Sequence, residues 1–287
     1  MTRALFLLLL LLSSSQRILA HQSIDSSSHR IDSAATRPIA GSSRVGTIWQ
    51  DLKESAFVGG KYVQQPFHWD SREWAIIATG VGITAVVELA DDQMVRDFMQ
   101  HNQGSFGDKL AWFGNNFYGN GMATVLAGGS LYAIGLETDN NKLRLMGRHV
   151  FQSFLYAGLT TTAIKFIAGR NRPYLNQGTF DYRGFSIDNA WNSMPSGHVT
   201  VATALSETLA ADIDNPWASA ALYTFAGATV FSRLYSDEHW LSDTFLASVI
   251  GTATGYWVAH QDEHYEAKQT GLLIVPGPTN LTFLWSF

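Results

Sequence analysis

The stretch SRLYSDEHWLSD places an arginine, a histidine and an aspartate close together, as Arg233, His239 and Asp243. An apolar run follows, so the stretch lies at the N-terminus of an expected helix. His239 and Asp243 are four residues apart, a spacing at which a helical carboxylate can reach an imidazole. Such a carboxylate fixes the tautomer and leaves the second ring nitrogen as a nucleophile or base. An ordinary surface His–Asp pair has the same spacing, so this stretch alone does not establish chemistry.

A second stretch, KFIAGRNRP, carries three cations: Lys165, Arg170 and Arg172. Lys165 and Arg172 are seven residues apart, about two helical turns, so they could share a helix face. Pro173 disfavours helix at Arg172 and should direct that side chain into the following loop. A lysine point charge and an arginine fork suit a tetrahedral oxyanion. The alternative is a basic helix end that complements the helix dipole.

A third stretch, SMPSGHV, predicts a tight turn at Pro195 and Gly197, followed by a helix that opens at His198 or Val199. Ser196 is the expected N-cap residue. Free backbone N–H groups at such a helix start bind anions. His198 could protonate a leaving oxygen, although an ordinary surface histidine is the alternative.

Taken together, the three stretches resemble the motifs KxxxxxxRP, PSGH and SRxxxxxHxxxD of the type 2 phosphatidic acid phosphatase (PAP2) superfamily. This superfamily also contains vanadium haloperoxidases and bacterial acid phosphatases. The resemblance spans roughly residues 74–260. Met194 departs from the tyrosine of the longer GSYPSGH pattern found in some soluble acid phosphatases, which weakens assignment to that subgroup.

The resemblance implies a phosphatase that acts on a phosphomonoester or pyrophosphate, with a lipid as the expected substrate. It implies a nucleophile that forms a phosphohistidine, a carboxylate that holds its ring, and a general acid: His239, Asp243 and His198. It also implies a set of phosphate-binding residues: Lys165, Arg172, Ser196, Gly197 and Arg233. No metal or other cofactor is expected. The alternatives are a vanadium-dependent haloperoxidase, a soluble non-specific acid phosphatase, and a non-catalytic lipid or anion binder.

The elements that must position these residues are predicted to be helices. Apolar segments occur near residues 74–90, 120–137, 150–168, 198–212, 216–231 and 243–260, separated by polar or glycine-containing turns. We therefore expect an all-α, PAP2-type bundle of about six core helices within residues 46–265. The connection at 169–197 has no clear period, and long loops inside compact domains are usually functional.

Composition narrows the class of protein further. The 287 residues are 46% hydrophobic, which supports a sizeable core, and the formal net charge of −5 argues against a nucleic-acid partner. The absence of cysteine excludes disulfides, thiolate metal sites and cysteine nucleophiles. The oligomeric state is not indicated.

The two ends of the chain carry separate signals. Residues 1–20 resemble a signal peptide, residues 21–45 a flexible linker, and residues 266–287 a strand tail that forms a short β-hairpin. We expect an exported protein, in the periplasm or associated with the outer membrane, with peripheral membrane contact. The alternative is an integral inner-membrane protein whose site faces the periplasm. Several apolar segments hold only about 15–17 residues, whereas a bilayer needs about 20.

Overall fold

The computed structural model describes residues 43–261, 272–276 and 281–285. The predicted signal peptide, and the predicted linker as far as residue 42, lie outside the described residues. Two short strands, β1 (Leu272–Pro276) and β2 (Leu281–Trp285), pair antiparallel with Ile274 opposite Phe283.

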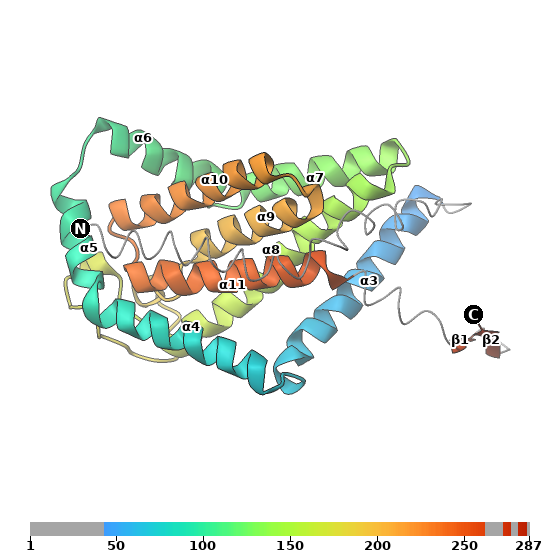
Figure 1. Cartoon of the computed structure of the whole chain (residues 1–287), viewed down its shortest axis with the longest axis horizontal. Helices are drawn as coiled ribbons and strands as arrows, with labels where there is room; N and C mark the ends of the chain where they lie inside the picture. The colour runs from blue at the N-terminus through green and yellow to red at the C-terminus, as the bar shows by residue number, and fades with distance from the viewer. Residues whose placement is uncertain (1–42, 262–271, 277–280, 286–287) are drawn as a thin grey trace.

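The expected all-α fold is confirmed, and each of the six apolar segments coincides with a helix (Figure 1). Segments 120–137 and 243–260 extend one or two residues beyond their helices, and the other four lie within them. The helices are α3 (Arg44–Gln64), α4 (Ser71–Ala90), α5 (Asp92–His101), α6 (Ser105–Phe113), α7 (Met122–Glu137), α8 (Asn141–Ala168), α9 (Gly197–Ile213), α10 (Pro216–Tyr235) and α11 (Leu241–Ala259).

The hydrophobic core lies between α7, α8, α9 and α10, together with the short π-helical turn η2 (Gly114–Tyr118). Val150 and Ala202 are fully buried there, and Leu205 is nearly so. Burial of apolar surface of this kind is the main stabilising contribution to the bundle.

Helices α9 and α11 run parallel and pack very closely. A Cβ added to Gly251 would lie 2.0 Å from Thr203 Oγ1, and one added to Gly255 would lie 2.8 Å from the Ala204 carbonyl oxygen. Larger residues at these two positions would force the helices apart. Because the helices are parallel, their N-termini meet at one end of the bundle, and Ser196 N–H donates to the Asp243 carbonyl there at 3.2 Å. Two helix N-termini at one point favour an anion between them.

Helix α4 is longer than its apolar segment. It begins at Ser71 because Asp70 accepts from the N–H groups of Arg72 and Glu73, and Glu73 accepts from the N–H of Asp70. This capping box adds a polar first turn to the apolar run. Of the described helices, α4 is the one whose length and composition would allow it to cross a membrane. Little of α4 is buried. The sequence counted this helix among six core helices, but most of its surface lies outside the core.

Helices α4, α5 and α6 form an arm that follows the bundle and turns around the end where α10 connects to α11 (Figure 1). Arg96 of α5 forms an ion pair with Asp237 of that connection, with 2.7 Å between Nε and Oδ1. Asp92 accepts from the Ser242 N–H at the start of α11 at 2.8 Å. The arm is therefore joined to the end of the bundle that carries the sequence motifs.

Candidate active site

The loop after α8 begins at a glycine that the backbone requires. Gly169 has φ +56°, and a Cβ there would lie 2.7 Å from the Gly184 nitrogen. Beyond it, Asn171 N–H donates to the Asp181 carbonyl and Arg172 N–H to the Ala190 carbonyl, each at 3.0 Å. The loop at 169–197, which has no clear sequence period, is therefore held in shape by hydrogen bonds between its own backbone groups.

Arg172 is not on the helix that carries Lys165. Helix α8 ends at Ala168, and Arg172 is extended, with φ −84° and ψ 150°. Its Nε donates to the Asn189 carbonyl at 2.9 Å, which fixes the direction of the guanidinium. The expectation that Pro173 would take Arg172 off the helix is met, whereas the shared helix face is wrong because the turn at Gly169 intervenes.

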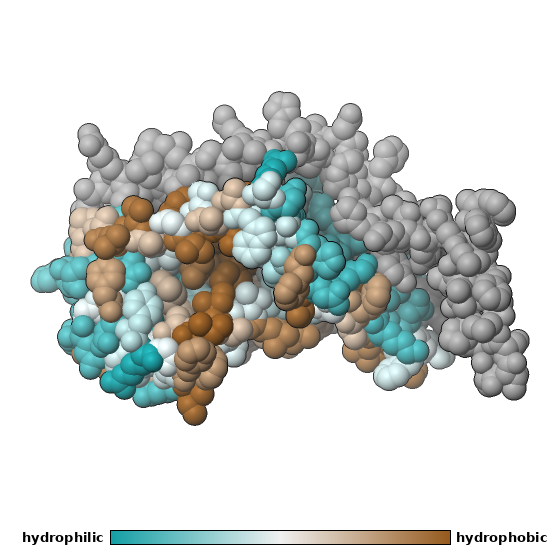
Figure 2. Space-filling model, turned by 90° about the horizontal axis from the view of Figure 1, so that it is seen from below, coloured by the Kyte–Doolittle hydropathy of each residue, from teal (hydrophilic) through white to brown (hydrophobic). Residues whose placement is uncertain are grey.

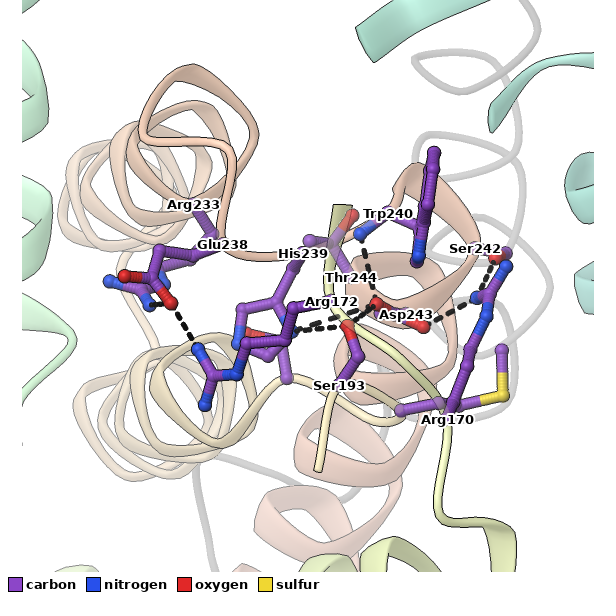
Figure 3. A network of polar contacts seen from close by, with 12 residues as sticks. Arg170, Arg172, Ser193, Arg233, Glu238, His239, Trp240, Ser242, Asp243 and Thr244 are labelled. Atoms are coloured by element: carbon purple, nitrogen blue, oxygen red, sulfur yellow. Dashed lines mark hydrogen bonds and ion pairs between the residues drawn. The ribbon is translucent and has the colours of Figure 1, made fainter. Parts of the chain in front are cut away.

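His239 and Asp243 face one another in the interior (Figure 3). His239 Nδ1 lies 3.6 Å from Asp243 Oδ2, and both side chains are almost completely buried. His239 is not helical, however, because α11 starts at Leu241 with Trp240 as its N-cap. Asp243 reaches back from the first turn, where its Oδ2 also accepts from the Trp240 N–H at 2.9 Å. The pairing was expected from the spacing, but the helical register assumed for it is wrong.

Asp243 is surrounded by hydrogen-bond donors. Ser193 Oγ donates to Oδ2 at 2.5 Å, and the Arg170 guanidinium donates to Oδ1 at 2.5 Å. Burial opposes ionisation of Asp243, but Arg170, His239 and Ser193 outweigh it and lower the pKa of its carboxyl below the usual value. Asp243 is therefore an anion that holds Nδ1 of His239 and leaves Nε2 as the free ring nitrogen.

Three cations gather around this pair: Lys165, Arg172 and Arg233, here called the cation cluster. Burial, together with the charges of Arg172 and Arg233, lowers the pKa of Lys165 to about 7. Burial also lowers the pKa of Arg233 to about 10. Arg233 donates to Asn115 Oδ1 at 2.5 Å, and its Nε has no partner among the described residues. Crowded cations of this kind are stabilised by a bound anion.

His198 and Ser196 lie at the start of α9. Burial and the cation cluster lower the pKa of His198 to about 4, so its ring is neutral near pH 7 in the unliganded site. Ser196 occupies the N-cap position as expected, but its hydroxyl makes no capping hydrogen bond. That buried Oγ has no partner in the described part of the chain, so it is available to a ligand. Gly197, the first residue of α9, lies beside Lys165, with 3.8 Å between an added Cβ and Lys165 Cε.

Glu238 places a carboxylate against the cation cluster (Figure 3). Its Oε2 accepts from Arg172 Nη1 and lies 3.5 Å from Arg233 Nη2. The Glu238 side chain is about one-third exposed, so it can leave this position for solvent. The two guanidinium groups thus present donors to one carboxylate, an arrangement that also suits a small oxyanion.

Several residues that the sequence did not assign to the site contribute to it. Ser193 was visible beside the PSGH motif but had no spacing rule to link it to Asp243. Asn115 lies 118 residues before Arg233, and no local signal connects the two. No group of three or more His, Asp or Glu side chains able to hold a metal is found among the described residues.

The geometry agrees with a known protein family. Residues 148–265, which contain all three motifs, match the model of the PAP2 superfamily. This segment, here called the PAP2 segment, is therefore similar to members of that superfamily. The PAP2 segment runs from within α8 to beyond α11, so α3 to α7 and the arm lie outside it.

Two individual proteins are similar to this chain. The lipid A 1-phosphatase of Porphyromonas gingivalis is 33% identical over 91 residues, which are 30% of this chain and 20% of that protein. The chain therefore spans about a fifth of the length of this curated relative. The crystal structure of Aquifex aeolicus LpxE superposes with a TM-score of 0.44 at 17% identity, covering 59% of this chain and 94% of that chain.

Proposed function

We propose that the protein is a metal-independent phosphatase that removes a terminal phosphate from a lipid through a phosphohistidine intermediate. The observation that carries the proposal is the buried His239–Asp243 pair, held by Ser193 beside the cation cluster. Nε2 of His239 attacks phosphorus as the bond to the leaving oxygen breaks, and His198 gives that oxygen a proton. Water then cleaves the P–N bond, which releases inorganic phosphate and restores the imidazole.

The cation cluster supplies the electrostatic part of this mechanism. The three cations and the N-termini of α9 and α11 face the position where charge spreads over the phosphoryl oxygens in the transition state. Donors fixed in advance in a buried site stabilise that charge with little reorganisation. Bound phosphate also raises the proton affinity of His198, because it offsets the cations that hold the pKa of its ring low.

A lipid substrate is supported by the surface of the arm. Large apolar side chains of α4 are exposed by half or more: Trp74, Ile76, Val81, Val86 and Leu89. Figure 2 shows the molecule from below, and hydrophobic residues gather in patches on that side. Exposed apolar patches mark interaction surfaces, including those for lipid. The same arm contacts the site through Asp92, and the similar protein from P. gingivalis is named for a phosphate on lipid A. We further propose export and contact with a membrane surface.

The purified protein should be tested with phosphatidate, lipid A 1-phosphate, a prenyl pyrophosphate and p-nitrophenyl phosphate, with released phosphate as the readout. We expect kcat/KM on at least one lipid to exceed that on the soluble ester. Bromide oxidation with added vanadate is measured in parallel. Haloperoxidation without phosphate release would contradict the proposal, and comparable rates on all monoesters would contradict the lipid assignment.

The His198→Ala variant should lose activity in proportion to the basicity of the leaving group. A general acid matters most when the departing oxygen is basic, so kcat/KM on an alkyl phosphate should fall about 10²–10³-fold. The loss on p-nitrophenyl phosphate should stay below about tenfold. Initial rates on both esters at one pH measure the difference. Equal losses would mean that His198 acts in binding.

Anion affinity should weaken as pH rises through neutrality. Lys165 titrates with a pKa of about 7 in the unliganded site, and only its protonated form attracts an anion. Sulfate keeps its charge between pH 6 and 9, so its Kd should rise by up to about tenfold per pH unit above 7. Calorimetric titration measures this without a substrate. In the Lys165→Arg variant the dependence should largely disappear, and an unchanged slope there would assign it to another group.

A further inference from the structure

We propose that Arg170, held by Glu88 and Asp92 of the arm, is a positioning residue that fixes Asp243 and, through it, controls how readily His239 takes up a proton. The inference rests on the proposed function and extends it to residues outside the PAP2 segment. The arm would then have two roles: it exposes an apolar surface, and it holds Arg170 in place.

The contacts of Arg170 carry the inference. Its side chain is completely buried, and its Nη1 donates to Asp243 Oδ1 at 2.5 Å and to Ser242 Oγ at 2.7 Å. Its Nη2 lies 2.8 Å from Asp92 Oδ2 and 3.1 Å from Glu88 Oε1. One guanidinium thus links a catalytic carboxylate to two carboxylates of the arm. The planar fork of arginine can make such contacts, whereas a lysine could serve only part of them.

Asp92 also fixes the start of α11 directly. Its Oδ1 accepts from the Ser242 N–H at 2.8 Å, and its Oδ2 accepts from Ser242 Oγ at 2.6 Å. Ser242 is the residue before Asp243, so the arm holds both the backbone and the charge partner of the helical turn that carries Asp243. A shift of about 1 Å in such a turn can reduce turnover about 100-fold.

The charges of this network have opposite effects on His239. The Arg170 charge offsets that of Asp243, so its loss leaves the Asp243 anion free to stabilise a protonated imidazole. The Asp92 charge works against Arg170, so its loss makes the surroundings more positive and disfavours the protonated imidazole. A purely structural network would not produce two shifts of opposite sign.

Other charged groups also surround the pair. Lys165 comes from α8, Arg172 and Tyr182 from the loop that follows, His198 from α9, Arg233 from α10, Glu238 from the connection to α11, and Glu88 and Asp92 from the arm. Within the described structure, Arg170 is the cation that contacts the Asp243 carboxylate. The remaining groups stay in place in the variants below.

The test is a titration of the His239 ring in the full-length protein by NMR, with ring-labelled histidine. The His239→Ala spectrum assigns the signal. We expect the His239 pKa to rise by about one unit in Arg170→Gln and to fall in Asp92→Asn. Glu88→Gln, a milder change at a partly exposed residue, should lower it by a smaller amount. Unchanged titration in the folded variants, or shifts of the same sign in all, would overturn the inference.

Asp51→Asn is the matched control. Asp51 is a buried carboxylate of α3 that lies 3.2 Å from Arg148 Nη1 of α8, so this variant also weakens a buried ion pair. Its melting temperature should fall without any change in the His239 titration. If its titration shifts as in Asp92→Asn, the effect reflects loosening of the fold, and the inference fails.

Turnover separates this inference from the proposed function. Arg170→Lys keeps the charge but loses the fork, so kcat should fall about 10–100-fold with little change in KM or in the His239 titration. An inactive wild-type protein would contradict the proposed function, while the NMR shifts would still decide the role of the network. Normal wild-type turnover, with titration and kcat unaffected in the variants, would contradict the network alone.

Discussion

The His239→Ala variant is expected to lose at least about 10⁴-fold in kcat, since the proposed mechanism has no other group to form the covalent intermediate. Asp243 and Ser193 would remain but would have no ring to orient. A radiolabelled phosphoenzyme, trapped from the wild type by rapid quenching under conditions that preserve phosphohistidine, should be absent in the variant. Sulfate binding should persist, because the cation cluster is unchanged.

The chain contains a matched control for this variant. His149 Nδ1 lies 3.2 Å from Asp212 Oδ2, a second buried His–Asp pair. Asp212 is near the C-terminal end of α9, about 20 Å along the helix from His198. His149→Ala should lower the melting temperature and leave kcat within about twofold. Retention of a tenth of the wild-type activity in His239→Ala would mean that another residue is the nucleophile.

The Asp243→Asn variant should lose about 10³–10⁴-fold in kcat while KM changes little. In the proposed mechanism the ring becomes cationic when His239 bonds to phosphorus, and the neutral amide cannot stabilise that charge. Its NH₂ group would also face a donor, either Arg170 or the Trp240 N–H, so the ring would be held less firmly. Steady-state kinetics on the best substrate of the panel measures both parameters.

Asp212→Asn is the corresponding control, because it changes the same residue type beside a histidine away from the site. It should reduce thermal stability without a comparable loss of kcat. If Asp243→Asn loses less than about tenfold, Asp243 does not orient the nucleophile, and its buried charge serves the fold alone.

Contacts between residues that are close in the sequence could be predicted, because they depend on helical spacing and on the conformational preferences of single residues. Four residues separate His239 from Asp243, and that spacing was enough to predict their contact although His239 is not helical. Likewise, Pro173 was enough to predict that Arg172 leaves the helix. Apolar periodicity was enough to locate six helices, whose parallel and antiparallel packing then brings the motifs to one end.

The parts that the sequence did not reveal depend on contacts between distant segments. Asp92 precedes Arg170 by 78 residues, and no periodicity relates a carboxylate in the arm to a guanidinium in a loop. Ser196 was predicted to cap α9, as its type and position suggested, yet its hydroxyl is left without a partner beside the cation cluster. Which of two hydrogen-bonding roles a serine takes depends on the neighbours that folding brings to it.

The position of Glu238 has a consequence for substrate charge. With its carboxylate between Arg172 and Arg233, Glu238 is a counter-ion that belongs to the site itself, so binding of a phosphate ester there would exchange one anion for another. A phosphomonoester with two negative charges displaces a carboxylate with one at a net electrostatic gain, whereas a phosphodiester brings only an equal charge. Ion exchange at Glu238 would therefore favour terminal phosphates over the singly charged diester linkages that are abundant in membrane lipids.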